Sequence, residues 1–338
     1  MLLTDLIAEI STIKIIGSEN VDIKNICSDS RKVTEGDLFV AVKGVAVDGH
    51  AYINTAIKNG AKVIFCQDIP SEIKPEVTYV QVEDSAECLG LLASAYYDYP
   101  SEKLIIIGVT GTNGKTTIAT LLYELYKELG YKVGLLSTVC NYINGRPIPS
   151  THTTPDALSL QKLLAEMAEE RCYYVFMEVS SHSVDQKRIA GINFDGAIFT
   201  NITRDHLDYH KTFSNYIKAK QDFFTNLPIH AFALTNVDDK NGKIITQNTN
   251  ANVYTYSLET HANFRAKVLE ESMDGMLLKI ENNELYVRLI GHFNAYNILA
   301  VYGVTKILRT PTEKVLLALS NLKPVNGRFE CYRLKNGA

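Results

Sequence analysis

The hydrophobic and polar positions of the first hundred residues alternate between short apolar runs and helical patterns. Apolar runs of strand length occupy residues 38–42, 62–66 and 78–82. Apolar positions with the spacing of one helix face occupy residues 52–59 and 85–97, and Gly60 ends the first of these segments. The pattern therefore predicts a small α/β domain over residues 1–100, which a Tyr-Pro-Ser linker at residues 99–101 closes.

The same alternation continues from residue 104 with longer elements. The isoleucine-rich run at residues 104–109 is typical of a strand that is buried on both faces of a parallel sheet. Further strands are expected at residues 132–137, 173–179, 197–201 and 231–236, and helices at 117–129, 156–169 and 213–224. Strands that alternate with helices predict a doubly wound parallel sheet.

A shorter pattern occupies residues 252–289. Its apolar runs are separated by turn signals at Asp274-Gly275 and Asn282-Asn283, which favours a small antiparallel β patch. Helices are expected at residues 292–308 and 312–319. The predicted fold class is therefore α/β, with a first domain at residues 1–100 and a central domain at residues 101–328.

Composition and charge exclude several classes of protein. At roughly 150 residues per domain, 338 residues suggest two domains. A net charge of −4 argues against a protein that coats nucleic acid or an anionic membrane. No apolar run approaches the roughly 18 residues that cross a bilayer, and the first ten residues lack the basic segment of a secretory signal. Six scattered cysteines without a C-x-x-C pair predict reduced thiols in a cytoplasmic protein.

A glycine-rich loop at residues 111–117 reads G-T-N-G-K-T-T and lies between a buried strand and a helix. Glycines let backbone N–H groups turn around phosphate oxygens, and the helix N-terminus adds a partial positive charge. Lys115 can reach the β- and γ-phosphates, and the Thr116 hydroxyl can ligate Mg²⁺. Val109 occupies the first glycine position of the strict phosphate-loop pattern. ATP is expected rather than GTP, since the chain has no N-K-x-D motif that would read guanine.

Polar residues follow two more strands. Glu178 ends the run at residues 173–179, and residues 200–210, which read T-N-I-T-R-D-H-L-D-Y-H, follow the next strand. The carboxyl ends of parallel strands are where such sheets bind ligands, and a carboxylate there suits Mg²⁺. For a single member such as His210, a structural role is an equal alternative. Lys220, on a helix, is by pattern alone a solvated charge.

Taken together, these motifs resemble the Mur ligase family, ATP-dependent amide ligases that build the peptide stem of peptidoglycan. Residues 111–117, 177–182 (M-E-V-S-S-H), 200–210 and 291–297 (G-H-F-N-A-Y-N) match the family in order. Residues 27–31 (C-S-D-S-R) and 36–41 (G-D-L-F-V-A) resemble its uridine-nucleotide domain. The resemblance covers nearly the whole chain and is most specific for the branch that adds the third stem residue.

The resemblance implies a role for each matching position. ATP would be held by the phosphate loop and by two asparagines near the base and ribose: Gly111, Thr112, Asn113, Gly114, Lys115, Thr116, Thr117, Asn294 and Asn297. The uridine and muramoyl-dipeptide parts of the substrate would contact Ser28, Ser30, Val45, Ala46, Val47, His152, Thr153, Thr154, Ser180, Gln186 and Arg188. His152 departs from the family, in which many members have asparagine. Magnesium would be held by Thr116, Glu178, His206 and Lys220, with Lys220 carbamylated by CO₂. Lys115, His206 and Lys220 would be the catalytic residues.

The implied activity is the ligation of diaminopimelate or lysine to UDP-N-acetylmuramoyl-L-alanyl-D-glutamate, with ATP and Mg²⁺. The family has a third domain whose D-N-P-R loop reads the incoming amino acid, and that motif is absent here. We therefore expect residues 329–338 to be the start of that domain, and the 338 residues alone to ligate poorly. We also expect a monomer in the cytoplasm, with no nucleic-acid partner and no membrane insertion.

Two alternative functions compete with this prediction: another ligase of the same fold, and a binding module without enzymatic activity. A folate-type ligase of the same fold is disfavoured by the N-terminal segment around Ser30 and by the D-H-L-D-Y-H motif. A nucleotide-sensing module built on an inactive ligase is disfavoured because the chain retains the full set of Lys115, Thr116, Glu178, His206 and Lys220.

Overall fold

The computed structural model describes residues 1–44, 47–150 and 152–324, so Val45, Ala46, Thr151 and residues 325–338 lie outside the described part. The chain forms two compact units. The first contains Met1–Glu102 together with Pro155–Ala165 and Asp185–Ile192, and the second contains Lys103–Thr154, Glu166–Val184 and the chain from Asn193 onward. We call residues 155–165 and 185–192 the two excursions. Sequence analysis set a boundary at residue 100 and had no signal for the excursions.

Among the residues that the structure describes, the first unit is built on a five-stranded sheet of order β1-β5-β4-β3-β2, in which only the β1–β5 pair is antiparallel. Its strands are β1 (Lys14–Ile16), β2 (Ile26–Cys27), β3 (Leu38–Val40), β4 (Val63–Cys66) and β5 (Thr78–Gln81), and its helices are α1 (Leu3–Leu6), α2 (Ile53–Lys58) and α3 (Ser85–Tyr96). Short 3₁₀ turns lie at Ser30–Lys32, Gly49–Tyr52 and Pro100–Lys103.

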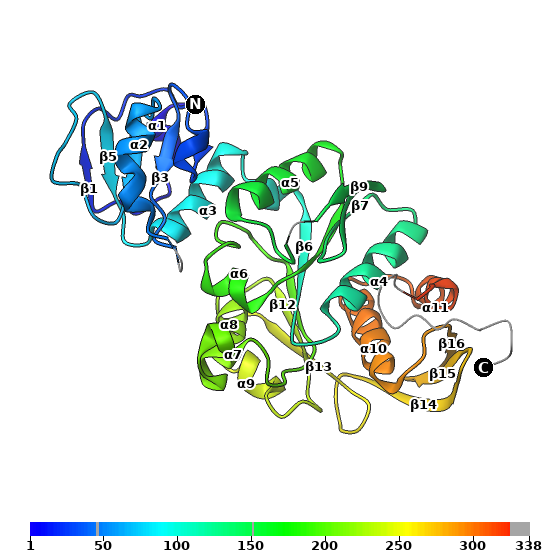
Figure 1. Cartoon of the computed structure of the whole chain (residues 1–338). Coiled ribbons are helices and arrows are strands. Elements are labelled where there is room, and N and C mark those ends of the chain that lie inside the picture. The colour runs from blue at the N-terminus through cyan, green and yellow to red at the C-terminus, as the bar shows by residue number, and fades with distance from the viewer. Residues whose placement is uncertain (45–46, 151, 325–338) are drawn as a thin grey trace, which may run out of the picture. The chain divides into compact units, whose positions relative to one another are not determined.

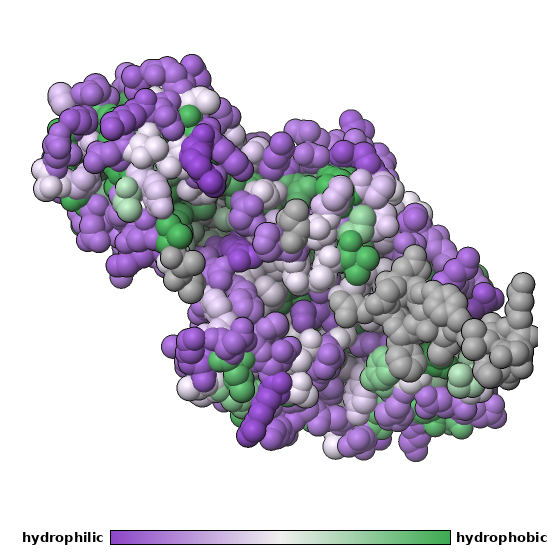
Figure 2. Space-filling model, viewed as in Figure 1, coloured by the Kyte–Doolittle hydropathy of each residue, from purple (hydrophilic) through white to green (hydrophobic). Residues whose placement is uncertain are grey.

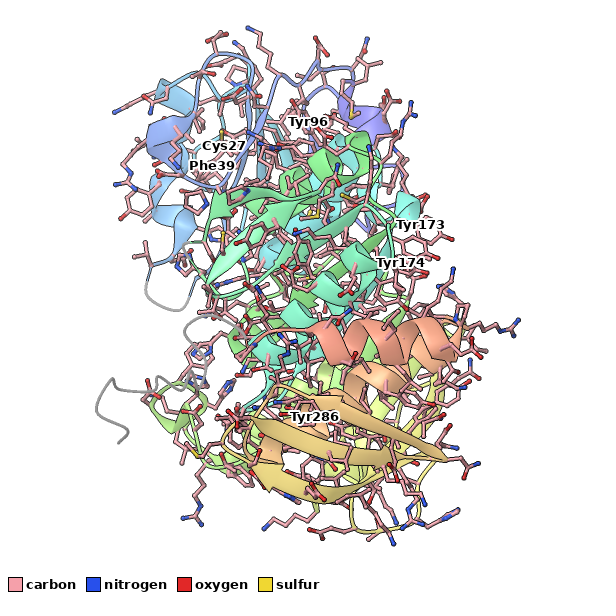
Figure 3. All side chains as sticks on the ribbon, turned by 90° about the vertical axis from the view of Figure 1, so that its right-hand side faces the viewer. Cys27, Phe39, Tyr96, Tyr173, Tyr174 and Tyr286 are labelled. Atoms are coloured by element: carbon pink, nitrogen blue, oxygen red, sulfur yellow. The ribbon has the colours of Figure 1, made fainter. Side chains whose placement is uncertain are left out.

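Both faces of this sheet are buried. Leu38 and Val40 of β3 pack into one apolar cluster, whereas Phe39, labelled in Figure 3, packs into a second. Successive side chains of a strand point to opposite faces, so continuous apolar runs are what a doubly covered parallel sheet requires. Asp84 begins α3 by accepting hydrogen bonds from the backbone N–H groups of Ala86 and Glu87.

The second unit is built on an eleven-stranded sheet of order β16-β15-β14-β13-β12-β11-β6-β10-β7-β8-β9 within the described residues. Its strands are β6 (Ile105–Thr110), β7 (Val133–Leu136), β8 (Cys140–Ile143), β9 (Arg146–Pro149), β10 (Tyr174–Glu178), β11 (Gly196–Phe199), β12 (Phe232–Asn236), β13 (Asn252–Ser257), β14 (Phe264–Ser272), β15 (Gly275–Ile280) and β16 (Asn283–Val287). The strands from β7 to β14 in this order are parallel, which confirms the predicted fold class.

The antiparallel part is smaller than residues 252–289. It begins at the β14–β15 pair and includes β16, on which Tyr286 lies (Figure 3). Strand β13 instead pairs in parallel with β12 and β14, so the sequence-based assignment of residues 252–257 to the antiparallel patch is wrong. Turn signals fix where strands end but not which neighbour they pair with. A second hairpin, β8–β9, was not predicted.

Helices cover both faces of this sheet (Figure 1). They are α4 (Lys115–Glu128), α6 (Ser181–Asp185), α7 (Leu207–His210), α8 (Phe213–Thr225), α9 (Gly242–Thr246), α10 (His292–Ile307) and α11 (Thr312–Asn321). Helix α5 (Ala157–Glu169) belongs mostly to the first excursion, and only its residues from Glu166 onward belong to the second unit. Helices α4, α10 and α11 share one apolar cluster with β6, β10 and β12. On the other face, α8 presents Phe223 to Gly108 of β6.

Replacing Gly108 with alanine is expected to lower the free energy of unfolding by about 1–3 kcal/mol. A Cβ at Gly108 would lie 2.6 Å from Phe223 Cζ and 2.9 Å from Val179 Cγ2, inside a closely packed layer. Urea unfolding measures the change. The double variant Gly108→Ala, Phe223→Leu should recover part of the loss, and a single-variant effect below about 0.5 kcal/mol would contradict the packing argument.

Hydrophilic residues dominate the face shown in Figure 2, where apolar residues form small separate areas. Among the residues that the structure describes, no helix has the length and apolar content needed to cross a bilayer.

Candidate functional site

Three strand ends meet at one edge of the second unit's sheet. Strand β6 lies between β10 and β11, and all three run in parallel, so the loops that follow Thr110, Glu178 and Phe199 emerge side by side. The chain passes from β6 to β7 and β10 on one side and then to β11 and β12 on the other. Ligands of open α/β sheets bind at such a reversal of strand order.

The phosphate loop is held in place by the loop that follows β11. The backbone N–H of Thr112 donates to Asn201 O at 2.8 Å, and that of Asn113 donates to Asn201 Oδ1 at 3.0 Å. The Thr200 hydroxyl donates to Asn113 O at 2.6 Å. Gly111 is required at this contact, because a Cβ there would lie 1.9 Å from Thr200 Oγ1. The shape of the phosphate loop is therefore supported by contacts within the second unit.

Two lysine side chains converge on a single carbonyl oxygen of this loop. Lys115 Nζ donates to Gly111 O at 2.8 Å and to Thr112 O at 3.0 Å, and Lys220 Nζ donates to Gly111 O at 3.0 Å. Lys220 is 1% exposed. Burial, together with the charge of Lys115, holds the pKa of Lys220 well below its ordinary value, although Asp205 opposes the shift. Lys220 is thus not the solvated charge that its helical pattern alone suggested.

Glu178 is a buried carboxylate at the end of β10. Its Oε1 accepts from the backbone N–H of Thr138 at 2.7 Å, and its Oε2 accepts from the Thr138 hydroxyl at 3.2 Å. Its backbone carbonyl accepts from the Thr154 hydroxyl at 2.9 Å. With two polar contacts fixing it, the carboxylate is oriented and retains lone pairs for a further ligand.

Glu178 and the phosphate loop line a common cavity of about 720 Å³. Its wall includes Thr112–Thr117, Thr138, Thr153, Glu178, Asn294 and Asn297. Asn297 Nδ2 donates to Asn294 Oδ1 at 2.8 Å, and Gly114 lies so close to Asn297 that a Cβ would approach its Oδ1 to 2.7 Å. The volume falls in the range of small-molecule sites.

His206 and Lys220 do not line this cavity. His206 begins α7 with a left-handed backbone conformation, and its ring lies 4.9 Å from that of His182. His210 is buried, and its Nε2 lies 2.9 Å from Ser181 Oγ, which is the structural role that sequence analysis weighed for it. Within the described part of the chain, no three His, Cys, Asp or Glu side chains gather as a metal site.

A second cavity, of about 1600 Å³, lies in the first unit. Ser28, Ser30, Val47, Gln186 and Arg188 line it. Ser30 is buried in a 3₁₀ turn that Asp29 begins by accepting from the backbone N–H of Arg31. Arg188 donates to Gln186 Oε1. Polar groups therefore converge on a concave surface, as expected of a binding site.

The second excursion carries Gln186 and Arg188, and it is anchored tightly to α3. A Cβ at Gly90 of α3 would lie 2.5 Å from Ala190 O, so only glycine allows this approach. Lys187 pairs with Glu87 at 3.3 Å, and Gln161 Nε2 from the first excursion donates to Gly191 O at 3.1 Å. These contacts fix one wall of the cavity.

The remaining sequence-predicted residues are dispersed. Ser180 is half-buried, and its hydroxyl accepts from the backbone N–H of Ser183 at 3.1 Å. His152 is exposed and lines neither cavity.

Thr138 and Tyr216 were missed by sequence analysis. Tyr216 lies one helical turn before Lys220, and that spacing was the available signal.

Comparisons with known proteins identify the family of the chain. The model of the Mur ligase middle domain matches residues 109–305, and the model described as Mur ligase family, catalytic domain, matches residues 22–97. The chain belongs to the Mur ligase family.

The most similar relatives include proteins named UDP-N-acetylmuramoyl-L-alanyl-D-glutamate–2,6-diaminopimelate ligase. That of Parabacteroides distasonis is 58% identical and that of Bacteroides thetaiotaomicron 54%; the matches cover 98% and 100% of this chain but 68% and 70% of the relatives. A solved structure with the same name matches with a TM-score of 0.83 at 26% identity, over 97% of this chain and 68% of its own. About three tenths of each relative thus has no counterpart in the 338 residues.

Proposed function

We propose that this chain belongs to an ATP-dependent ligase that joins diaminopimelate to UDP-N-acetylmuramoyl-L-alanyl-D-glutamate. The observation that carries the proposal is the common cavity of Lys115 and Glu178 at the point where the strand order reverses. The names of the relatives support the substrate, and they favour diaminopimelate over lysine as the added amino acid.

The reaction has two steps. A carboxylate oxygen of the D-glutamate residue attacks the γ-phosphorus of ATP, the bond to the β,γ-bridging oxygen breaks, and an acyl-phosphate and ADP form. The amine then attacks the acyl carbon, the carbon–oxygen bond to phosphate breaks, and the amine loses a proton as the amide forms. Lys115 would exchange its bonds to Gly111 O and Thr112 O for phosphate oxygens and offset charge on the transferring group.

Magnesium, when bound, would draw the phosphate oxygens together and neutralise their charge. Oxygen ligands with several waters are what Mg²⁺ prefers, and the Glu178 carboxylate and the Thr116 hydroxyl, which line one cavity, fit that preference. They would hold the ion, and His206, which does not line this cavity, would contribute through water.

We also propose that Lys220 carries a carbamate. A neutral amine attacks CO₂, a nitrogen–carbon bond forms, and the nitrogen releases a proton to water. The lowered pKa of Lys220 supports this step, since burial favours the unprotonated amine. The carbamate would place an anion beside the phosphate loop, where the amine is neutral. A ¹³C carbamate signal after equilibration with ¹³C-bicarbonate tests the modification.

The cavity of the first unit would hold the uridine and muramoyl parts of the substrate. Ser28, Ser30, Gln186 and Arg188 provide hydroxyl, amide and guanidinium groups that suit a nucleotide sugar. Thr153, Thr154 and Ser180 are proposed contacts of the dipeptide. The reaction would take place in the cytoplasm, where ATP is available.

Calorimetric titration with UDP-N-acetylmuramoyl-L-alanyl-D-glutamate tests the substrate. We expect selective binding relative to UDP-N-acetylmuramic acid and to the tripeptide product, and at least about tenfold weakening in Arg188→Gln. Lys62→Gln, which removes a charge of the first unit that pairs with Glu35 at 2.9 Å and does not line the cavity, is the matched control and should change the affinity less. Equal binding of all three ligands would refute the assigned step.

A further inference from the structure

Tyr216 connects two parts of the nucleotide site through one side chain. It lies on α8 and is 1% exposed. Its hydroxyl oxygen lies 3.1 Å from Thr112 Oγ1 in the phosphate loop, and its ring centroid lies 4.6 Å from Lys220 Nζ. One rigid ring therefore contacts both the loop and the buried lysine.

The Thr112 hydroxyl, which Tyr216 contacts, also bonds to another segment of the site. Thr112 Oγ1 also accepts from the backbone N–H of Thr203 at 3.0 Å, and Thr112 O accepts from Lys115 Nζ at 3.0 Å. The loop after β11, the phosphate loop and α8 thus meet at one residue. A shift of Thr112 would move the backbone that Lys115 contacts.

We propose that Tyr216 is a positioning residue for phosphoryl transfer, which sets the phosphate loop and Lys220 relative to each other. The inference rests on the proposed nucleotide function. Phenylalanine would fill the same space, so packing alone needs the ring but not the hydroxyl. Catalytic geometry is sensitive to displacements of about 1 Å, and a buried hydrogen bond between helix and loop restricts such displacement.

The chain offers a matched control for a purely structural role. Tyr126 OH lies 2.9 Å from Thr310 Oγ1, so Tyr126→Phe removes the same kind of tyrosine–threonine contact elsewhere in the second unit. Both tyrosines are buried, and neither Tyr126 nor Thr310 lines the nucleotide cavity. A general loss of stability would follow either substitution, whereas a positioning effect would follow only Tyr216→Phe.

The experiment measures the dissociation constant of the Mg²⁺ complex of AMP-PNP, a non-hydrolysable ATP analogue, by calorimetry, together with the melting temperature. We expect Tyr216→Phe to weaken binding about fivefold and Thr112→Val at least as much, because the valine also loses the bond from the Thr203 N–H. The double variant should be no weaker than Thr112→Val, since the Tyr216 hydroxyl has already lost its Thr112 partner there. Thr112→Ser should restore binding, and Tyr126→Phe should leave it within about twofold.

Each outcome bears on the inference. Wild-type affinity in Tyr216→Phe would overturn it, and so would single effects that multiply in the double variant, because the two hydroxyls would then act independently. If Tyr126→Phe also weakened nucleotide binding, a general loss of stability would explain the effect of Tyr216→Phe, and the inference would fail. Absence of nucleotide binding by the wild-type chain would instead overturn the proposed function, and the inference with it. If Tyr216→Phe does not fold, the comparison of Thr112→Val with Thr112→Ser decides.

Discussion

Lys115→Met is expected to weaken binding of the Mg²⁺ complex of AMP-PNP by about 100-fold. The lysine would donate charge-assisted hydrogen bonds to phosphate oxygens, each worth about 1.5–3 kcal/mol, and methionine keeps the length of the stem without the charge. Gly111 O retains a donor in this variant, because Lys220 Nζ also bonds to it at 3.0 Å. Folding should therefore be preserved, and the melting temperature verifies that.

Lys127→Met is the matched control, since Lys127 lies on the same helix, half-exposed, and pairs with Glu124 at 3.6 Å. It should change the affinity less than about twofold. If Lys115→Met bound the nucleotide within about threefold of wild type, the loop would not be the phosphate site that we propose.

In CO₂-free buffer at neutral pH, where Lys220 is the free amine, Lys220→Met is expected to stabilise the fold by about 1–3 kcal/mol. After equilibration with ¹³C-bicarbonate, the same variant should lack the carbamate signal. A buried amine is costly because its charged form loses hydration, whereas methionine fills the same volume without that cost. The carbonyl that Lys220 contacts keeps Lys115 as its donor. Gained stability together with lost chemistry would indicate a residue kept for function.

The pH dependence follows from the lowered pKa of Lys220. Between that pKa and the ordinary value of 10.5, the unfolded chain binds more protons than the folded chain, so wild-type stability rises with pH. Lys220→Met lacks this rise, and its advantage should shrink from about pH 7 to about pH 9. Urea unfolding at both pH values measures the difference. Lys218→Met, on the exposed side of α8, should show neither effect, and a constant advantage of Lys220→Met would contradict the assignment.

Local patterns predicted most of the parallel sheet. The isoleucine run of β6, the helical spacing of α4 and the glycines between them are all contiguous, so the phosphate loop could be placed from the sequence. The pairing partners of the strands were harder to predict. The segment of β13 is short and bounded by turns, as in a hairpin strand, but β13 pairs in parallel with β12. The hairpin β8–β9 was missed because Pro147 and Pro149 interrupt its second strand.

The positions of site residues could be predicted from the sequence where the residues directly follow a strand. They could not be predicted where packing between distant segments sets the position and burial of the side chain. Glu178 ends a strand, and its position at the sheet edge follows from that alone. The burial of Lys220 depends on how α8 packs against β6, which no local pattern contains. The choice between diaminopimelate and lysine could not be made from the residues, because none in the chain was assigned to the incoming amine.

The two excursions bear on how such a protein can be recombined during evolution. Exchange of residues 1–102 alone between two relatives would leave Gln186 and Arg188 behind, so the new cavity would receive a wall from the other parent. The contact of Gly90 with Ala190 leaves no room for a Cβ, so a first parent with a larger residue at position 90 would clash with the second excursion of the other parent. The first unit is therefore one compact body in space, but three separate stretches of the gene encode it. Recombinant proteins made by a single crossover near residue 102 should have a defective cavity in this unit.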